Sequence, residues 1–317
     1  MIRHIAVGMA ATVFVSVLLG GCEQSVSTPI KIGINPWPGY EFLYLAQERG
    51  FYEEQGVAVE IVEYGSLSDV RRGYERGNLD AMASTLVEVL QVKNNSTRNP
   101  QVFLIADFSS GGDVIIARQP MSTPADLKGK RIGADTTSLP LFVLARALES
   151  SGLTLGDVDV VPLEQSDMEQ AYVRGEIDVA VTYPPVSVRL RSREDSSVIF
   201  TSQAIPGEIV DVVSVEASVL QERPQDIRKI LMAWDQALRY AEAQPQQAYE
   251  IMAKREGITA AEFAGALGDL EIVSLADQPK YFPLLKPTLV KIKEVLVETG
   301  ALAPNVSADC CVPESLH

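Results

Sequence analysis

Two segments of this chain repeat the same residue pattern, and the repeat constrains the fold more than any other feature. Residues 74–85 read YERGNLDAMAST, and residues 172–183 read YVRGEIDVAVTY. Upstream of them, KIGIN at residues 31–35 matches RIGAD at residues 131–135. Unrelated strand–helix units can look alike by chance, but here both the order and the spacing of the matching words are kept. The repeat therefore predicts two related lobes.

Each copy of the repeat predicts the order strand, loop, helix, strand, helix, strand. The strands are short β-branched runs without polar alternation, as in a mostly parallel sheet that helices cover on both faces. The fold class is therefore α/β, with two Rossmann-like lobes. Apolar residues at helical spacings of three and four occur in both copies, at Phe42, Leu45 and Ala46 and at Leu141, Leu144, Ala145 and Leu148.

Two extended segments connect the predicted lobes. PQVFLIADFSSGGDVIIARQP and VIFTSQAIPGEIVDVVSVEASVL each indicate two strands joined by a turn, and the chain after them is helical. The chain would cross between the lobes near residues 108–114 and again near residues 203–212, which makes a two-strand hinge. We expect the first lobe to contain residues 30–110 and 208–317, and the second lobe to contain residues 111–207.

The N-terminus carries the pattern of a secreted protein. Arg3 precedes the apolar run IAVGMAATVFVSVLL, and GGC follows, ending at Cys22. A charged start, a short apolar core and small residues before a cleavage point are typical of a signal peptide. LGGC also resembles a bacterial lipobox, which implies removal of residues 1–21 and lipidation of Cys22. The alternative is a plain signal peptide with an incidental cysteine. The polar residues 22–29 would then form a flexible tether.

The charge balance excludes two classes of partner. Residues 1–21 contain one charged residue, Arg3, so their removal leaves 26 of the 27 Lys and Arg against 42 Asp and Glu, a net charge of −16. Nucleic acid and anionic lipid surfaces both attract clustered Lys and Arg. The acidic balance argues against both, and otherwise it favours solubility without naming a ligand.

The positions of histidine and cysteine exclude common catalytic sites. The two histidines, His4 and His317, lie at the ends of the chain. The folded body then has no histidine for a Ser-His-Asp or Cys-His mechanism or for a usual zinc site, so we expect no enzyme activity, metal or cofactor. Cys310 and Cys311 are adjacent. They could form a strained vicinal disulfide in an oxidising compartment, pair elsewhere, or be an inert feature of the tail.

Several short segments of the sequence resemble those of one protein family. YLAQERGFYEEQGVAVEIVEY, RGNLDAMAST, ADLKGKRIG, DVAVTYPPVS and IPGEIVDVVSV are similar to the sulfonate, nitrate and thiamine-precursor (NMT1-like) branch of the bacterial solute-binding proteins of ABC importers. The resemblance covers nearly the whole chain after Cys22 and says little about the ligand. It implies the type II periplasmic-binding-protein fold. It also implies a monomer that closes on a small solute and delivers it to a membrane permease driven by an ATPase.

The same resemblance implies a periplasmic or extracytoplasmic location, with acyl chains such as palmitate on Cys22 holding the protein to the cell membrane. One alternative is a sensing module that presents solute to a membrane signalling receptor, because a fold does not decide its function. Another is an enzyme, since a pyrimidine-synthesising branch of this fold relies on histidine and a cysteine cluster. The folded body here lacks histidine.

The repeat also predicts where a ligand binds. In open parallel sheets, ligands bind beyond the carboxyl ends of the strands. The loop NPWPGYE after the first strand and its counterpart DTTSLP in the second lobe would face each other across a cleft, with a second pair of strand ends beside them. The candidate ligand-binding residues are Asn35, Trp37, Tyr40, Glu41, Ser84, Thr85, Asp113, Thr136, Thr137, Ser138, Tyr183 and Asp211.

The two facing loops differ in the chemistry that they offer. Trp37 and Tyr40 could form flat apolar walls or cation–π faces, or they could plug the core of the lobe. Thr136, Thr137 and Ser138 precede a predicted helix. Their hydroxyls and the helix amides could hold an anionic or hydrogen-bonding group, or they could simply cap the helix.

The remaining candidates favour a ligand with an amine. Tyr183 lies in TYPPV, where the family often has an aromatic residue that touches the ligand. Glu41, Asp113 and Asp211 are candidate partners for an amine or a hydroxyl, and the last two lie in the predicted crossings. Few cations lie in these loops. We therefore expect a zwitterion or a neutral polar molecule, taurine- or sulfonate-like or vitamin-precursor-like, rather than a fully anionic ligand.

Overall fold

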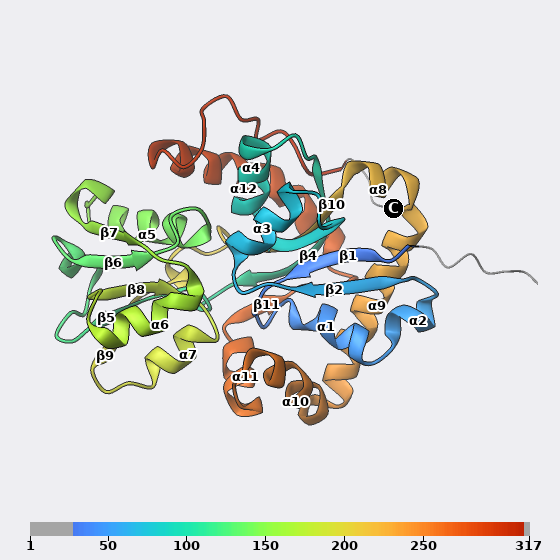
Figure 1. The fold of residues 1–317 in the computed structure, drawn as a ribbon, viewed down its shortest axis with the longest axis horizontal. Coiled ribbons are helices and arrows are strands. Elements are labelled where there is room, and N and C mark those ends of the chain that lie inside the picture. Colours follow the sequence, from blue (N-terminus) through green and yellow to red (C-terminus); the bar gives the residue numbers. More distant parts are fainter. Residues whose placement is uncertain (1–27, 314–317) are drawn as a thin grey trace, which may run out of the picture.

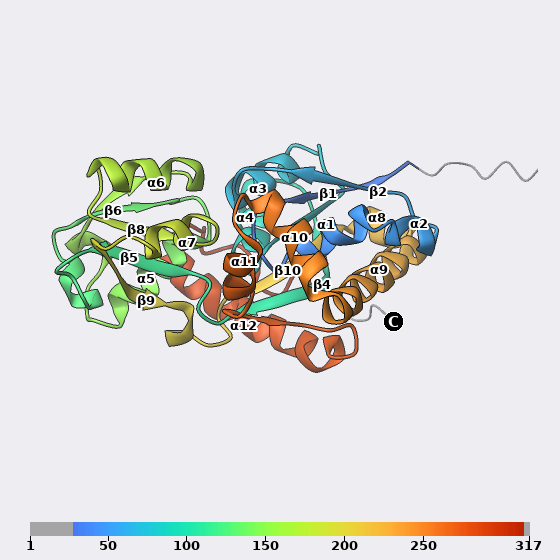
Figure 2. The same cartoon turned by 90° about the horizontal axis from the view of Figure 1, so that it is seen from below.

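The computed structural model describes residues 28–313, which form two α/β lobes lying side by side (Figure 1). Each lobe has one sheet with helices on both faces, which Figure 2 shows from below. The predicted signal peptide, the predicted lipidation site Cys22 and most of the tether lie outside the described residues. None of the helices between residues 28 and 313 combines the length and the apolar character that a membrane crossing requires.

The first lobe is built on a six-stranded sheet. Its strands are β1 (Ile30–Ile34), β2 (Val59–Glu63), β3 (Ala81–Thr85), β4 (Pro100–Ser109), β10 (Val210–Glu216) and β11 (Leu270–Ile272). Their order in the sheet is β11-β4-β10-β3-β1-β2. β1 pairs parallel with β2 and β3, whereas β10 runs antiparallel to β3 and β4, and β11 runs antiparallel to β4.

The second lobe is built on a five-stranded sheet. Its strands are β5 (Val114–Arg118), β6 (Arg131–Ala134), β7 (Asp159–Pro162), β8 (Val179–Thr182) and β9 (Ser196–Thr201). Their order is β7-β6-β8-β5-β9. β6 pairs parallel with β7 and β8, and β5 runs antiparallel to β8 and β9.

The two sheets share one core topology, as the repeat predicts. A central strand, β1 or β6, pairs in parallel with a strand on each side. Beyond one of these neighbours, β3 or β8, come two further strands, each antiparallel to the strand before it. The register matches too, because Gly33 of β1 pairs with Met82 and Gly133 of β6 pairs with Ala180. In each sheet the first of the antiparallel strands, β10 or β5, enters directly from the other lobe.

Helices cover both sheets, and several begin at a capping residue. Ser66 and Thr85 accept hydrogen bonds from the first turns of α3 and α4, which satisfies backbone donors that a helix leaves free. In the first lobe the helices are α1 (Glu41–Glu48), α2 (Phe51–Gln55), α3 (Leu67–Glu75), α4 (Leu86–Asn95), α8 (Ala217–Glu222), α9 (Pro224–Ala243), α10 (Pro245–Glu256), α11 (Ala260–Leu267) and α12 (Gln278–Glu298). In the second lobe they are α5 (Leu139–Glu149), α6 (Gln165–Arg174) and α7 (Val186–Arg191), with short 3-10 turns at η1 (Pro124–Leu127), η2 (Leu155–Asp157) and, in the return crossing, η3 (Ser202–Ala204).

The chain crosses between the lobes twice. Residues 110–113 join β4 to β5, and residues 202–209 join β9 to β10. The hydroxyls of Ser109 and Ser202 lie 2.9 Å apart, and the backbone N–H of Gly111 donates to Ser202 Oγ at 2.6 Å. The two crossings are therefore bonded to each other, so a motion of one lobe against the other acts on both.

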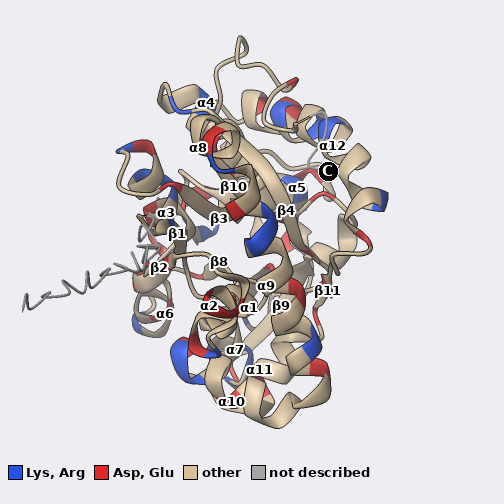
Figure 3. Ribbon diagram, turned by 90° about the vertical axis from the view of Figure 1, so that its right-hand side faces the viewer, with Lys and Arg blue, Asp and Glu red and all other residues tan. Residues whose placement is uncertain are grey.

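The apolar strands form the core of each lobe. All five residues of β3 are buried, and so are all four residues of β8. Trp234 of α9 is fully buried and meets Phe42 of α1 with ring centroids 5.6 Å apart. Most charged residues lie outside this core, with buried acids such as Glu88 and Asp107 as exceptions, and in the view of Figure 3 acidic and basic residues lie interspersed on several helices.

The C-terminal segment returns to the first sheet. After α12, Cys310 and Cys311 form a disulfide between adjacent residues. Cys311 is buried, and its carbonyl accepts a 2.7 Å hydrogen bond from the backbone N–H of Val102 in β4. Of the alternatives left open by the sequence, the structure therefore has the vicinal disulfide, as part of the packing of the tail against β4.

Candidate functional site

A small enclosed space lies between the two lobes, beyond the carboxyl ends of β1 and β8. The gaps between its atoms add up to about 170 Å³, but none of them is wide enough for a water molecule; we call this space the interlobe cavity. Six of its eight lining residues are ligand-binding candidates of the sequence, which the fold thus brings together; their contact with a ligand stays a prediction. The lining residues are Asn35, Trp37, Tyr40, Leu67 and Asp211 from the first lobe, Asp113 from the crossing, and Leu139 and Tyr183 from the second lobe.

Trp37 is held from both lobes. Its indole N–H donates to Asp107 Oδ2 in β4 at 3.2 Å. Its ring meets Tyr183 of the second lobe edge-on, with centroids 6.1 Å apart and planes at 79°, and it meets Tyr40 at 6.4 Å. Aromatic pairs at these separations attract each other. The tryptophan is therefore a wall of the cavity that also joins the two lobes.

Two glycines make room for Trp37 and its partner. A Cβ at Gly39 would lie 1.8 Å from Asp107 Oδ2, and a Cβ at Gly112 would lie 2.7 Å from the Trp37 ring. Only glycine allows such a close approach without a collision. The segment PWPGY thus provides both the bulky ring of Trp37 and Gly39, which leaves room for the Asp107 carboxylate to reach that ring.

Two aspartates, Asp113 and Asp211, line the cavity, and a third, Asp107, bonds to Trp37 of its wall. Asp107 and Asp211 lie directly opposite each other on β4 and β10, an arrangement that disfavours two like charges. The Tyr40 hydroxyl donates to Asp211 Oδ1 at 2.5 Å. Asp113 approaches from the crossing before β5. Their exposed fractions are 0% for Asp107 and 2% for each of the other two, so all three are withdrawn from water.

The environment of these aspartates favours their neutral form. Burial raises the pKa of Asp107 to about 8 and the pKa of Asp113 to about 7. Burial, with the charges of Asp107 and Asp113, raises the pKa of Asp211 well above its ordinary range. Among the described residues, Asp113 Oδ2 has no hydrogen-bond partner, whereas a hydrogen bond between the carboxyls of Asp107 and Asp211 partly offsets the rise in the pKa of Asp107. Buried charges are normally paired, so this cluster can take up a positive group.

The N-terminal end of α5 is occupied by a carboxylate of the protein itself. Ser138 Oγ and the backbone N–H of Leu139 donate to Glu88 Oε1 at 2.6 and 2.9 Å. The other Glu88 oxygen accepts from the N–H and the hydroxyl of Thr85 at 3.0 and 2.6 Å. Glu88 lies in α4 of the first lobe and is fully buried. The predicted anion-binding position is therefore an interlobe contact in this structure.

The other polar candidates lie around this contact. Thr137 is exposed and donates its hydroxyl and backbone N–H to Asp135, while Thr136 is half-buried. Ser84 is buried at the end of β3, with its hydroxyl 3.4 Å from the carbonyl of Thr85. None of the candidates Ser84, Thr85, Thr136 and Thr137 lines the interlobe cavity.

Glu41 holds the loop after β1 from its other side. It begins α1, and its carboxylate accepts hydrogen bonds from the guanidinium of Arg255 in α10. Arg255 also donates to the carbonyl of Asn35 at 3.0 Å. Burial raises the pKa of Glu41 to about 7, and Arg255 opposes that rise. Glu41 thus lies in an ion pair that supports the loop, and it does not line the cavity.

Ion pairs join the lobes at the rim. Arg72 of α3 pairs with Glu164 before α6 at 2.8 Å, and Arg191 of α7 pairs with Asp269 after α11 at 3.0 Å. Such partly exposed pairs contribute at most about 1 kcal/mol each. The buried contacts of Trp37 and Glu88 therefore contribute more to holding the lobes together than the rim does.

Sequence reasoning missed two residues of the site, Asp107 and Glu88. Asp107 interrupts the apolar run VFLIADF, and an acid inside a buried strand is a signal that could have identified it. Glu88 follows Thr85 by three residues, which is the spacing of a capping box and predicts its local role. No local pattern indicates that Glu88 also bonds to the second lobe.

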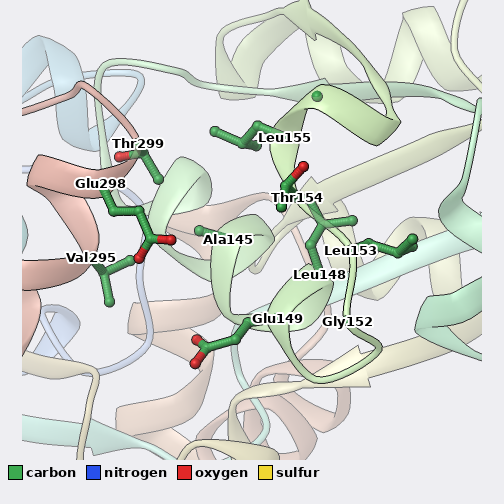
Figure 4. Close-up of a pocket in the computed structure, with 11 residues that line it drawn as sticks. Ala145, Leu148, Glu149, Gly152, Leu153, Thr154, Leu155, Val295, Glu298 and Thr299 are labelled. Carbon is green, nitrogen blue, oxygen red and sulfur yellow. The ribbon is translucent and has the colours of Figure 1, made fainter.

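A larger hollow lies between α5, the η2 turn and the end of α12 (Figure 4). Leu148, Leu153 and Val295 contribute apolar surface, and Glu149 and Glu298 are its charged residues. No candidate from the sequence lines it. It lies at the C-terminal end of α5, whereas ligands of open parallel sheets bind beyond the carboxyl ends of the strands, so the interlobe cavity is the candidate site.

The fold and the site together define a class of protein. Two α/β lobes are joined by two crossings, and a cavity lined from both lobes lies between them. The chain belongs to the NMT1/THI5-like family, whose sequence pattern matches residues 37–248. This finding confirms the branch predicted from the sequence words.

Named relatives and solved structures agree with this family. The taurine-binding periplasmic protein of Escherichia coli is 25% identical over 181 residues, 56% of each chain. The 4-amino-5-hydroxymethyl-2-methylpyrimidine phosphate synthase of Aspergillus parasiticus is 23% identical over 67% of this chain and 66% of its own. The alkanesulfonate-binding protein SsuA of Xanthomonas axonopodis pv. citri, solved with MOPS, has a TM-score of 0.75 at 16% identity, over 90% of this chain and 99% of that one. The structural likeness confirms the type II periplasmic-binding-protein fold.

Proposed function

We propose that this chain is the extracytoplasmic solute-binding protein of an ABC importer, and that it captures a small polar or zwitterionic organic solute by closure of its lobes. The interlobe cavity is the observation that carries the proposal. Its wall comes from both lobes, so it is complete only while they are together. A membrane permease would receive the solute when the lobes part, and the ATPase of the importer would drive transport. The binding protein would act as a monomer.

Two similar proteins support binding rather than catalysis. One is named as taurine-binding and periplasmic, and the other is described as alkanesulfonate-binding. The family also includes an enzyme, the pyrimidine phosphate synthase. Residues 28–313 of this chain contain no histidine, the side chain most often used for proton transfer near neutral pH. We therefore assign capture of a solute, without turnover.

The membrane attachment that we propose rests on residues 1–29. Cleavage before Cys22 and acylation of that cysteine would leave the lobes on a short polar tether. Each buried CH₂ group of an acyl chain contributes about 0.8 kcal/mol to membrane binding. Cys22→Ala is therefore expected to move the mature protein from the membrane fraction to the soluble fraction. An unchanged distribution would contradict lipid anchoring without affecting the proposed solute binding.

The solute-binding function is tested with the purified protein and fractions of a small-molecule extract of its own cells. A bound solute stabilises a protein by RT ln(1 + [L]/Kd), so one fraction should raise the melting temperature. The same fraction should lower the radius of gyration measured by X-ray scattering, because it closes the lobes. Conversion of the stabilising molecule into a product would show an enzyme instead. Extract fractions that change neither quantity would contradict the proposal.

A further inference from the structure

We propose that the interlobe cavity selects a small organic cation with an ammonium group, which Asn35, Asp113 and Asp211 receive as hydrogen-bond acceptors. This inference rests on the proposed solute-binding function and narrows its substrate class. It separates this chain from proteins that bind sulfonates, whose ligands carry a negative charge. Three properties of the site support this assignment: acceptors without donors, aromatic walls, and hydrogen-bond donors that are already occupied by the protein's own carboxylates.

The free acceptors match the donors of an ammonium group. Asn35 Oδ1, Asp113 Oδ2 and Asp211 Oδ2 accept no hydrogen bond from an N–H or hydroxyl group of residues 28–313, and each of the three residues lines the cavity. The Asp211 carboxyl also bonds to that of Asp107 when one of the two is protonated, so it is a free acceptor once both are ionised. Each of the three lining residues is at most 2% exposed, so water is not a ready substitute. A primary ammonium has three N–H donors and no acceptor. Leaving buried acceptors unpaired costs free energy, and such a cation would satisfy all three.

Aromatic rings form much of the remaining wall. Trp37, Tyr40 and Tyr183 line the cavity, and Trp37 has a centroid distance of 6.1 Å to Tyr183 and 6.4 Å to Tyr40. The faces of such rings attract cations, and tryptophan does so most strongly. Leu67 and Leu139 complete the lining and offer apolar contact to a hydrocarbon body. This combination suits an ammonium on a short apolar chain.

An anion finds no counter-charge in the cavity. None of its described lining residues is Lys or Arg. Arg255, the guanidinium behind the loop after β1, is bonded to Glu41 and to the Asn35 carbonyl. The nearest cluster of donors, at the N-terminal end of α5, is bonded to Glu88. A sulfonate would face carboxylates and would have to displace Glu88 to reach those donors.

The electrostatics of the empty cavity agree with this assignment. Burial raises the pKa of Asp113 to about 7 and that of Asp211 well above its ordinary range. Both shifts express the cost of holding a negative charge there without a counter-ion. A bound ammonium would supply that counter-ion and let the carboxylates ionise. No part of the cavity is wide enough for a water molecule while the lobes are in contact, so a solute enters only when the lobes part, and the walls must move to enclose it.

The test compares four probes of similar size by isothermal titration calorimetry on the purified protein at pH 8. Butan-1-amine is the cation, butan-1-ol the neutral analogue, butane-1-sulfonate the anion, and taurine the zwitterion. We expect butan-1-amine to bind at least about 30-fold more tightly than each of the other three, as for a buried charge pair. Binding of the sulfonate or taurine as tight as that of the amine would overturn the inference. So would equal binding of the amine and the alcohol.

Two variants connect the preference to the proposed acceptors. Asp113→Asn and Asp211→Asn keep the shape of the side chain and remove its charge. Each is expected to weaken butan-1-amine binding at least about 30-fold while leaving butan-1-ol within about threefold. Glu242→Gln, at an exposed acid of α9, is the control and should change neither affinity. Wild-type amine affinity in both Asn variants would overturn the inference, and the unfolding curve of each variant shows whether it is folded.

The outcomes separate this inference from the proposed function. If the sulfonate or taurine binds more tightly than the amine, the ammonium assignment fails and solute binding stands. If none of the four probes binds but an extract fraction stabilises the protein and closes its lobes, the ammonium assignment fails and solute binding again stands. If neither the probes nor any extract fraction has an effect, both fail.

Discussion

The loop after β1 and the loop after β6 occupy equivalent places in two sheets of the same topology, yet their chemistry differs. The first loop sends Trp37 and Tyr40 to the interlobe cavity. The second ends in the donors of Ser138 and Leu139, which bond to Glu88 of the opposite lobe. A repeat thus preserves the position of a loop, because strand pairing sets that position. The side chains at the loop's tip remain free to differ.

The difference divides the contact between the lobes into two parts. An aromatic part, Trp37 against Tyr183, encloses the cavity. A polar part, Glu88 against the start of α5, lies beside it and is fully satisfied by internal hydrogen bonds. The polar part is therefore structural in the closed form, and the aromatic part, with its unpaired carboxylates, is where the molecule has capacity for a ligand.

The largest expected effect comes from breaking the polar part. Glu88→Ala removes the acceptor of Ser138, Leu139 and Thr85 together. Each buried donor left unpaired costs about 1–3 kcal/mol, so we expect the free energy of unfolding to fall by about 5 kcal/mol. Equilibrium unfolding in urea measures this change. Glu88→Gln keeps one acceptor oxygen and should lose roughly half as much. A Glu88→Ala variant as stable as the wild type would show that the contact contributes nothing.

A somewhat smaller effect is expected in the aromatic part. Trp37→Ala leaves a cavity beside Tyr183 and removes the bond to Asp107, so unfolding should become easier by about 3–4 kcal/mol. Trp37→Phe keeps a ring but not the N–H donor, and about 1 kcal/mol of loss is expected from that bond. The same urea titrations provide the measurement. Equal losses in the two variants would mean that the hydrogen bond, not the ring, stabilises the site.

The pH dependence of stability is expected to distinguish the aspartates from ordinary acids. Asp107 faces Asp211 and Asp113, and Asp211 also faces Tyr40 and Glu88. In the unfolded chain these aspartates ionise near pH 4, whereas in the folded chain the pKa of Asp107 is raised to about 8. The folded protein thus holds more protons between about pH 4 and pH 8, and its stability falls as pH rises through that window.

The matching measurement is urea unfolding of the ligand-free protein at pH 5 and pH 8. We expect stability at pH 8 to be lower by on the order of 2 kcal/mol. Asp107→Asn cannot ionise and should reduce this difference, whereas Glu242→Gln at an exposed position should leave it unchanged. A wild-type protein that is more stable at pH 8 than at pH 5 would contradict the raised pKa values.

The smallest effect is expected at Thr137, in the loop that is equivalent to the aromatic one. Its hydroxyl is exposed and bonds only to Asp135 within the same turn. Thr137→Ala should change the free energy of unfolding by no more than about 0.5 kcal/mol. Affinity for butan-1-amine should also stay within about twofold of the wild-type value. A large loss of affinity in this variant would move the ligand toward the second lobe.

Part of the candidate site followed from the sequence because parallel strands bring their carboxyl ends to one edge. Four predicted residues line the cavity for this reason: Asn35, Trp37 and Tyr40 after β1, and Tyr183 after β8. Asp113 and Asp211 were predicted instead from their places in the crossings between the lobes. The prediction could not separate the residues after β1 from Glu41, which the same loop carries but which turns toward Arg255. A pattern places a residue near a strand end, whereas the direction of its side chain depends on partners distant in the chain.

Asp107 and Glu88 show where sequence patterns reach their limit. Asp107 belongs to the site because β10 pairs beside β4 and sets Asp211 directly opposite it. Glu88 reaches the second lobe because the two crossings bring α4 and α5 together. Both contacts join residues that are far apart in the chain, so no local spacing announces them.

The sequence by itself determined the two-lobed α/β architecture, because repeated runs of buried strands and amphipathic helices leave few other ways to cover their apolar faces. It also limited the chemistry, since residues 28–313 supply more acids than bases and no histidine to a site between the lobes. The tertiary structure alone decided which acids meet in one buried place and which donors are already used. That decision needs contacts across the sheet and between the lobes, and these exist only once the chain has folded.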